Sequence, residues 1–229
     1  MPHDPRREAP LHRRRRTALS VSAAIVAATP LLAACGNAAH PGAAAVVGGD
    51  RIEVSSLQAQ VKEVRAAQGR QPQAAQLIGN TGQLSRIKLR DMITVLVVER
   101  AAADVGVTVS RKEVQEEYRA AVAQSGGEQA FAARLLQGNA LAPGQIEQAV
   151  RTQILVTKLA AALGTELGSP QAEQKIGTAL SAASKELHIS VNPRYGSWDD
   201  VNVRLGDYRT PWVTQVSQAA GPGGARVSG

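Results

Sequence analysis

The feature that most constrains the fold is a long apolar stretch in the middle of the chain, residues 83–105. Apolar side chains recur along it with helical spacing, and residues 92–98 are nearly all apolar. A helix that is apolar around most of its circumference is typical of the centre of a domain. Gly106 follows directly and is suited to end the helix. We therefore predict a central helix against which the other elements pack.

The composition agrees with a helical fold. Hydrophobic residues make up 44% of the chain but aromatic residues only 3%, so the core is built mostly from Ala, Val, Leu and Ile. Such side chains suit close-packed helices, whereas a large sheet sandwich usually contains more aromatic and β-branched residues. The sequence predicts a mainly α, multi-helix fold.

Capping and turn signals divide the rest of the chain into further elements. Ser55 and Ser110 are each followed three residues later by Gln or Glu, the spacing of a capping box, and Ser169 precedes a proline at the start of the last helix. Helices are predicted to begin near residues 55, 83, 110, 128, 143 and 169, with a loop at 70–82 in which a helical turn in the middle is left open. Short strands are predicted at 46–52 and 188–192, near the two ends of this region.

The N-terminus has the three parts of a secretory signal. A basic stretch ends in four arginines at residues 13–16, an apolar run covers residues 17–34, and the sequence Leu-Ala-Ala-Cys ends at Cys35. The apolar run is marginal for a permanent membrane span, and Pro30 breaks a spanning helix near its end. An uncleaved anchor helix is the alternative, and the arginines leave the route of export open.

The sequence LAAC resembles the lipobox of bacterial lipoproteins. The resemblance implies cleavage before Cys35, thioether lipidation of its thiol and attachment of the mature chain to the cell membrane by acyl chains such as palmitate. Cys35 is the one cysteine in the sequence, which excludes a disulfide framework and a cysteine-based metal site. We expect residues 1–34 to be the signal peptide and residues 35–45 to be a flexible tether.

The formal net charge of +7 does not indicate nucleic-acid binding. Residues 1–34 carry six Arg against Asp4 and Glu8, a net charge of +4, so the rest of the chain carries +3. These remaining charges are interspersed along the predicted helices, as on an ordinary solvated surface. Nucleic-acid recognition needs a clustered basic face, and we expect no nucleic-acid partner.

Three segments occur in an order and spacing that resemble a known family. They are ERAAADVGVTVSRKEVQEEY (99–118), FAARLLQGNALAPGQIEQAVRTQILVTKL (131–159) and VNPRYGSWD (191–199). Over residues 46–199 the chain is similar to the N-terminal chaperone domain of the SurA-like family, which is related to PrsA foldases and to the substrate-binding part of trigger factor. The resemblance implies a helical domain whose first and last strands pair as a small two-stranded β element. It also implies binding of unfolded client proteins through apolar grooves.

Many relatives in this family also carry a parvulin-type prolyl isomerase domain. That module needs on the order of a hundred residues, an ordinary domain size. The sequence after residue 159 is taken up by the last helix and strand, and the histidines outside the signal are His40 and His188. We therefore expect a protein that is not an enzyme, without isomerase activity, cofactor or metal.

Isolated polar residues do not build an active site in this sequence. Ser85 and Lys88 have Ser-x-x-Lys spacing, but the companion motifs of penicillin-recognising enzymes are absent, and both are expected on a helix surface. His188 has no second histidine nearby for metal binding. Asp199 and Asp200 are adjacent in a turn and are expected to be solvated.

Three aromatic residues are candidates for either core packing or client binding: Tyr118, Tyr195 and Trp198. Tyr118 belongs to the apolar stripe of its predicted helix. Tyr195 and Trp198 follow the last helix, and because large aromatics usually bury themselves, we favour a plug at the end of the small sheet over a binding groove. Residues 200–229 show no sustained period and are expected to be a mostly disordered tail.

These patterns together favour a membrane-anchored, extracytoplasmic protein that holds unfolded or newly exported proteins without ATP. The sequence contains no phosphate-binding glycine loop. The alternative is a non-catalytic scaffold lipoprotein that uses the same helices to dock one specific envelope partner. A surface that adapts to many peptides favours the first function, and one rigid complementary patch favours the second.

Replacement of Cys35 by alanine tests the lipid anchor. Without the thiol the acyl chains have no attachment point, so Cys35→Ala is expected to leave the membrane fraction or to keep its signal peptide. The measurement is membrane fractionation together with the electrophoretic mobility of the chain. A variant that fractionates and migrates like the unmodified protein contradicts lipidation at this residue.

Overall fold

The computed structural model describes residues 42–207 of the 229-residue chain. The predicted signal peptide, Cys35 and residues 208–229 of the predicted tail lie outside the described residues, as does most of the predicted tether. The description below concerns residues 42–207.

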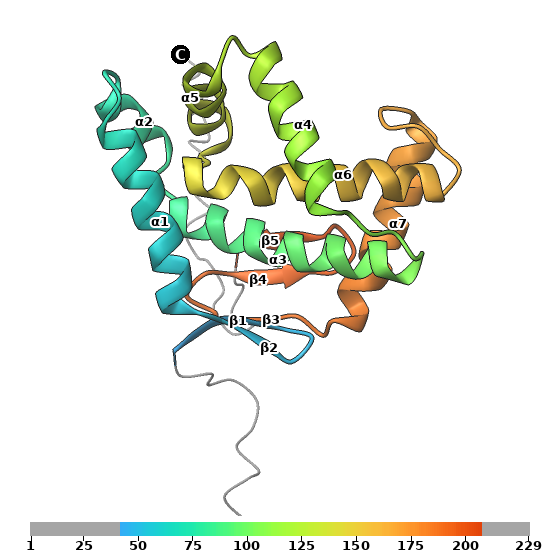
Figure 1. Ribbon diagram of the computed structural model, residues 1–229. Coiled ribbons are helices and arrows are strands. Elements are labelled where there is room, and N and C mark those ends of the chain that lie inside the picture. The colour runs from blue at the N-terminus through green and yellow to red at the C-terminus, as the bar shows by residue number, and fades with distance from the viewer. Residues whose placement is uncertain (1–41, 208–229) are drawn as a thin grey trace, which may run out of the picture. The chain divides into compact units, whose positions relative to one another are not determined.

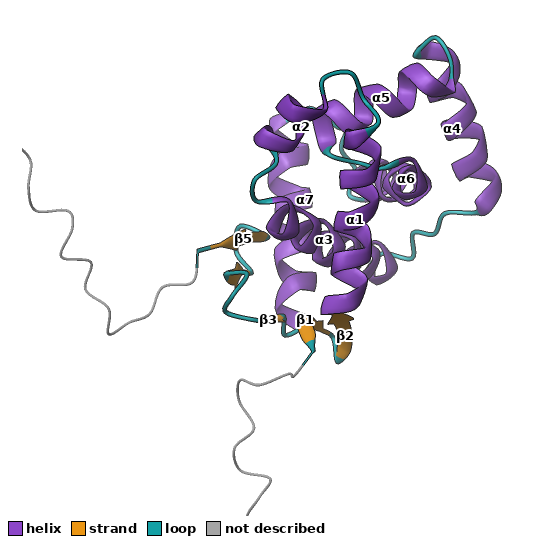
Figure 2. Cartoon of the chain, turned by 90° about the vertical axis from the view of Figure 1, so that its left-hand side faces the viewer, coloured by secondary structure: helices purple, strands orange, loops and turns teal. Residues whose placement is uncertain are grey.

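Helices make up most of the described residues (Figure 1). The α-helices within residues 42–207 are α1 (Val54–Gly69), α2 (Ala74–Asn80), α3 (Leu84–Asp104), α4 (Arg111–Gln124), α5 (Glu128–Asn139), α6 (Ile146–Ala162) and α7 (Pro170–Glu186), with a short 3-10 helix, η1 (Pro143–Gln145), before α6. The strands are β1 (Ala43–Val47), β2 (Asp50–Glu53), β3 (Ser190–Val191), β4 (Ser197–Asp199) and β5 (Arg204–Gly206). Figure 2 shows β1, β2 and β3 at one end of the helical part and β5 along its side. The predicted mainly α fold is confirmed.

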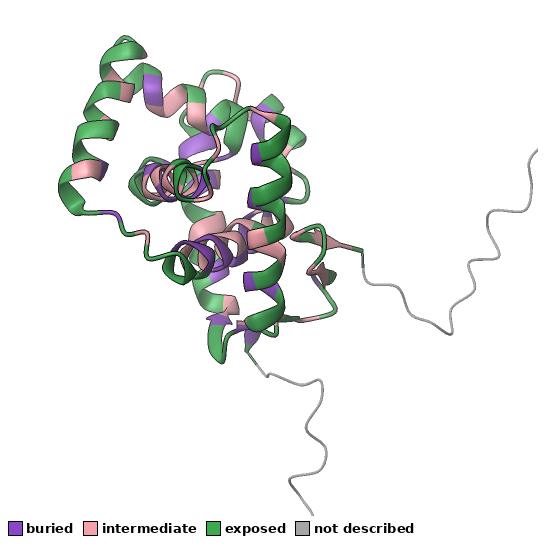
Figure 3. Ribbon diagram, turned by 90° about the vertical axis from the view of Figure 1, so that its right-hand side faces the viewer, coloured by how far each residue is buried: buried purple, intermediate pink, exposed green. Residues whose placement is uncertain are grey.

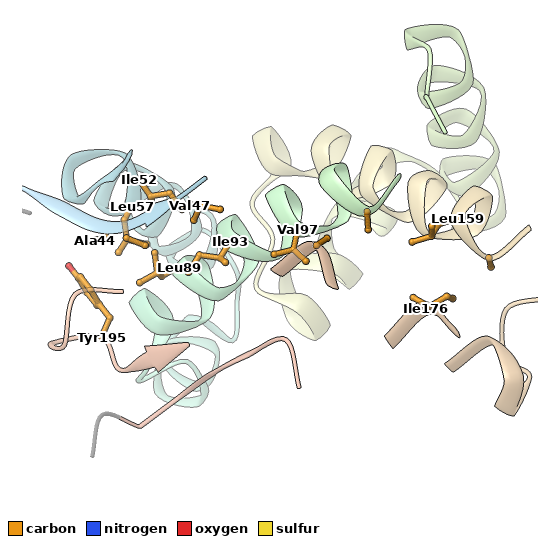
Figure 4. Packing of buried hydrophobic residues seen from close by; sticks show 14 of the residues in the cluster. Ala44, Val47, Ile52, Leu57, Leu89, Ile93, Val97, Leu159, Ile176 and Tyr195 are labelled. Carbon is orange, nitrogen blue, oxygen red and sulfur yellow. The ribbon is translucent and has the colours of Figure 1, made fainter. Parts of the chain in front are cut away.

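α3 is the central element of the fold. It contacts α1, α6, α7, β1 and β5, and its residues Leu89, Ile93 and Val97 are completely buried. Figure 4 shows these side chains in a row between the strands on one side and α6 with α7 on the other. Each aliphatic side chain buried in this way contributes about 1.5–3 kcal/mol relative to an exposed one. The predicted central helix is confirmed, one residue shorter at each end than residues 83–105.

The two ends of the described chain meet in a small sheet. Its order is β2-β1-β3, both pairings are antiparallel, and Ala45 lies opposite Val191. Gly48 and Gly49 connect β1 to β2 with φ values of +61° and +92°, as a two-residue hairpin turn requires. The predicted pairing of the first and last strands is confirmed, but the sheet has three strands instead of two because the N-terminal segment is itself a hairpin.

The described domain extends beyond both predicted boundaries. β1 begins at Ala43, inside the predicted tether at 35–45, and its three alanines are 0–1% exposed. At the other end β5 pairs with β4, within the predicted tail. Alanine has a low strand propensity, and three residues are too few to show a period, so the sequence predicts neither the alanines of β1 nor β5 as strand. The described strands thus begin at Ala43 and end at Gly206, on either side of the predicted range 46–199.

Two local predictions around α1 are wrong. The N-cap residue of α1 is Glu53, which makes no side-chain cap hydrogen bond, so Ser55 and Gln58 do not form a capping box. The segment 70–82, predicted as a loop with at most a helical turn in its middle, contains the seven-residue helix α2, whose C-cap residue is Thr81. There Arg65 of α1 donates to the Thr81 hydroxyl at 2.6 Å and to its carbonyl at 2.7 Å. These long-range contacts, which no local pattern shows, hold α2 against α1.

Gly196 permits the close approach of β4 and β5. Its φ is +128°, and a Cβ built on it lies 2.1 Å from the carbonyl oxygen of Gly206. The backbone conformation and the short contact both oppose a side chain. We expect Gly196→Ala to lower the free energy of unfolding by about 2–4 kcal/mol, measured by urea denaturation.

Gly177→Ala is the matched control for this substitution. Gly177 lies within α7, and a Cβ built there has no heavy atom within 4 Å. Alanine is favoured over glycine inside a helix by about 0.5–1 kcal/mol, so this variant is expected to be as stable as the unmodified protein or more so. Equal stability of the two variants contradicts the steric role of Gly196.

Candidate functional site

Helices α4 and α5 form an arm that rises from the rest of the helices (Figure 1). We call residues 111–139 the arm. Of the residues of α4 only Val114 is buried, and of those of α5 only Phe131 and Leu136. Figure 3 shows that most of α4 is exposed. The arm therefore has few fully buried side chains and a large exposed surface.

An aromatic pair joins the two helices of the arm. Tyr118 on α4 meets Phe131 on α5 edge to face, with ring centroids 5.7 Å apart and planes at 77°, a favourable geometry for aromatic rings. The Tyr118 hydroxyl donates to Glu128 Oε1 at 3.2 Å. Burial, and then this carboxylate, raise the pKa of Tyr118. The predicted aromatic candidate Tyr118 thus holds the arm together and remains partly exposed.

The arm packs on α3 and α6 through a second apolar cluster. Its buried members include Val98 of α3, Val114 of α4, Phe131 of α5 and Leu155 of α6. Around these lie apolar side chains that are only partly buried: Tyr118, Ala121, Val122, Ala132, Leu135 and Ile154. We call these six residues the candidate client-binding surface, because partly exposed apolar residues that lie together are typical of interaction sites.

Polar contacts fix the base of the arm. Ser110 caps α4 as predicted: its hydroxyl accepts from the Glu113 N–H at 3.3 Å, and Glu113 Oε2 accepts from the Ser110 N–H at 2.8 Å. Lys158 on α6 forms an ion pair with Glu113 and donates to the Thr108 carbonyl at 2.9 Å. These contacts hold the start of α4 against α6.

Tyr195 and Trp198 lie in the other large apolar cluster, which includes residues of the strands. Tyr195 is 5% exposed and Trp198 is partly buried. The Trp198 indole N–H donates to Ser184 Oγ at 2.8 Å, and the Ser184 hydroxyl donates to Asp200 Oδ1 at 2.5 Å. Asp200 is therefore partly buried and hydrogen-bonded, not solvated as predicted. Since Tyr118 belongs to the arm cluster, the structure does not bring the three aromatic candidates together.

The prediction that Lys88 lies on a helix surface is wrong, because its side chain is 1% exposed. Its ammonium lies 3.1 Å from Asp91 Oδ2 and 3.5 Å from Gln145 Oε1. Gln145 also donates to the carbonyl of Gln60 on α1 at 3.1 Å. A buried charge requires partners of this kind. Lys88 thus ties α3 to α1 and to the turn before α6, through Asp91 and Gln145 and not through Ser85.

The remaining candidates show no assembled chemistry in residues 42–207. In this part of the chain no three His, Cys, Asp or Glu residues are grouped so that they could hold a metal ion. His188 follows α7 with a φ of +45°, and its Nδ1 lies 2.8 Å from the Glu186 carbonyl oxygen. Among the described helices, none combines the length and the apolar character that a membrane span requires.

The fold defines the class of protein: a helical domain that is closed by strands from both ends of the described chain and carries a two-helix arm. The family model of the SurA-like N-terminal domain matches residues 12–160, more than half of the 229-residue chain. The chain therefore belongs to the SurA-like N-terminal domain family, which is chaperone-related. The match begins within the predicted signal peptide and ends in α6. No curated protein and no solved structure matches the chain.

The ion pair at the base of the arm predicts a pH dependence of stability. The hydrogen bond from Lys158, and then those from Ser110, lower the pKa of Glu113 to about 2 from 4.5. A lowered folded-state pKa contributes stability that is present above about pH 4.5 and is lost as the pH falls through about 2. We expect the difference in Tm between the unmodified protein and Glu113→Gln to shrink over this range, by a few degrees at most because the pair is exposed.

Glu117→Gln is the control for this pH series. Glu117 lies on the same helix and is exposed. The Tm of Glu117→Gln is therefore expected to equal that of the unmodified protein at every pH. The measurement is thermal unfolding followed by circular dichroism between pH 6 and pH 2. A Tm difference for Glu113→Gln that stays constant over this range contradicts the role assigned to the ion pair.

Proposed function

We propose that this protein is a lipid-anchored, extracytoplasmic holdase that binds unfolded or newly exported proteins without ATP. The observation that carries the proposal is the candidate client-binding surface, a set of partly exposed apolar side chains on the arm and on the neighbouring helix α6 of a chaperone-related domain. Few of the arm's side chains are fully buried. The arm therefore offers apolar area to a partner without first unfolding the rest of the domain.

The chemistry of this surface suits extended segments of many different sequences. Five of its six residues are Ala, Val, Leu or Ile, and the sixth, Tyr118, has its hydroxyl engaged by Glu128. Such a surface recognises apolar area and carries little hydrogen-bonding pattern to select one sequence. Each client side chain that it buries contributes up to about 1.5–3 kcal/mol, part of which offsets the cost of ordering the client. Weak and reversible binding follows.

Passive holding by such a surface requires no nucleotide. A protein that binds only the unfolded state of a client lowers the concentration of free unfolded client by mass action. Aggregation depends on encounters between free unfolded chains, so a lower free concentration slows it. The client folds when it dissociates, and we propose that the chain acts in this way without isomerase activity of its own.

The lipid anchor is part of the same proposal. Cys35 precedes Gly42, the first described residue, by seven positions. An extended chain spans at most about 3.3–3.6 Å per residue, so a lipid on Cys35 keeps the start of the domain within about 25 Å of the membrane surface. Exported proteins emerge at this surface in an unfolded state, which is where a holdase is needed.

Light scattering of a refolding, aggregation-prone protein tests the proposed function. The chain from residue 36 onward is added without ATP, and scattering is expected to fall with increasing amounts of it for several unrelated clients. The double variant Val122→Ser, Leu135→Ser makes the candidate client-binding surface more polar. Both side chains are only partly buried, so the variant is expected to fold, as checked by circular dichroism, and to suppress aggregation several-fold less.

Val201→Ser is the matched control. Val201 is 68% exposed in the turn between β4 and β5, so this variant also replaces an apolar surface residue by serine, but outside the arm. Val201→Ser is expected to suppress aggregation of the client as strongly as the unmodified chain does. No suppression by the unmodified chain at several-fold excess contradicts the holdase, and binding to one folded envelope protein alone then supports the scaffold function.

A further inference from the structure

Arg134 on α5 is held in place by its neighbours, yet none of the described residues supplies it with a carboxylate partner. Its Nη2 donates to the Ser125 hydroxyl at 2.8 Å, and its guanidinium carbon lies 5.6 Å from the centroid of the Phe131 ring. Within residues 42–207 no ion pair involves Arg134, and the residue is exposed. The side chain is therefore positioned by neutral groups, and its positive charge is not compensated by them.

Other charged residues of the arm are either paired or not held. Lys112 lies 3.8 Å from Glu116, with which it forms an ion pair. Glu128, on the same helix as Arg134, accepts a hydrogen bond from the tyrosine of α4 instead. Arg119 is exposed, and within residues 42–207 no hydrogen bond or ion pair holds its side chain. Arg134 differs from these residues because it combines a fixed position with an uncompensated charge.

The local structure at the end of α4 explains why Arg134 is fixed. Ser125 is the C-cap residue of α4, and its hydroxyl donates to the Ala121 carbonyl at 2.6 Å, which leaves the oxygen lone pairs for the guanidinium. The Phe131 ring is 4% exposed, and a cation is attracted to the face of such a ring. The end of α4 lies at the free end of the arm (Figure 1). The charge of Arg134 is therefore presented at the end of the arm that is remote from the strands.

Arg134 also borders the candidate client-binding surface. The Ser125 hydroxyl that holds Arg134 is bonded to Ala121, a member of that surface. The Phe131 ring next to the guanidinium meets the ring of Tyr118, another member, with centroids 5.7 Å apart. Each residue of an extended chain spans about 3.3 Å, so about four residues of a client are enough to reach from the Tyr118 ring to the guanidinium.

We infer that Arg134 is a carboxylate subsite of the candidate client-binding surface, which selects apolar client segments that carry a glutamate or aspartate within about four residues of their apolar side chains. This inference rests on the proposed function, because it names the class of client that the surface binds. A guanidinium offers five N–H donors in a planar fork that matches a carboxylate, and the bond to Ser125 uses one of them. Because the side chain is already held, less conformational entropy is lost when a client carboxylate binds.

The apolar neighbours of Arg134 strengthen its contact with a client carboxylate. A client segment that covers Tyr118 and Ala121 excludes water from the region around the guanidinium, and opposite charges attract more strongly where the dielectric constant is lower. A lysine of the client at the same place is repelled by the guanidinium. The subsite therefore distinguishes clients by the sign of their charge, which the apolar side chains of the surface do not.

Labelled peptides that differ in one residue test the subsite. Each has blocked ends and alternates leucine with serine, with a glutamate, a glutamine or a lysine at its centre, and its dissociation constant with the full chain is measured by fluorescence anisotropy. The glutamate peptide is expected to bind about threefold to tenfold more tightly than the glutamine peptide, and the lysine peptide more weakly than either. Arg134→Gln retains an N–H donor for Ser125. It is expected to remove the preference for glutamate and to bind the glutamine peptide as the unmodified chain does.

Arg119→Gln is the matched control, because it removes an equal charge from the exposed surface of α4. This variant is expected to keep the preference for the glutamate peptide. Equal affinities of the glutamate and glutamine peptides for the unmodified chain overturn the subsite and leave the holdase in place. An equal loss of the preference in both variants also overturns the subsite, because the total charge of the arm then explains it. If none of the peptides binds, the candidate client-binding surface itself is wrong, and the subsite is overturned with it.

Discussion

The pairing of β1 with β3 joins the two ends of the described chain, and the rest of the fold depends on it. Closing so long a loop costs conformational entropy, and the two residue pairs of the ladder, Ala45 with Val191 and Val46 with Ser190, are too few to offset that cost alone. The apolar area that the pairing brings together supplies the rest. β1 and α3 share one buried cluster that also contains residues of α6 and α7, so the sheet and the central helix are stable together and not separately.

The small side chains of β1 explain how a strand comes so close to α3, and also why the sequence did not reveal it. Ala43, Ala44 and Ala45 are 0–1% exposed, and larger side chains in such a dense core are expected to strain it. In a sequence, however, a run of alanines beside glycine and proline is typical of a tether. The helices were predicted well where caps and period coincide, as at Ser110 and Ser169, which both cap as expected.

Burial of polar residues was the part of the site that the sequence could not predict. The apolar stripe of α4 that contains Tyr118 was visible from spacing alone, but the period of one helix does not show which helix faces it. The residues of α5 that pack against this stripe could be identified only from the structure.

The prediction that Lys88 lies on a helix surface was wrong for the same reason. The burial of its side chain depends on Gln145, which the fold brings to α3 from the start of α6.

A client-binding surface has to be apolar enough to bind and still keep the protein from associating with itself. The arm reconciles these demands through the two faces of α4. One face carries partly buried apolar residues, and the other carries exposed charges of both signs, including Lys112, Glu116, Glu117 and Arg119. Mixed charges around an apolar surface maintain solubility, while the ion pair between Glu113 and Lys158 fixes where that surface lies. The apolar surface is thus held in place and flanked by charges, which agrees with the weak capture of extended chains that we propose.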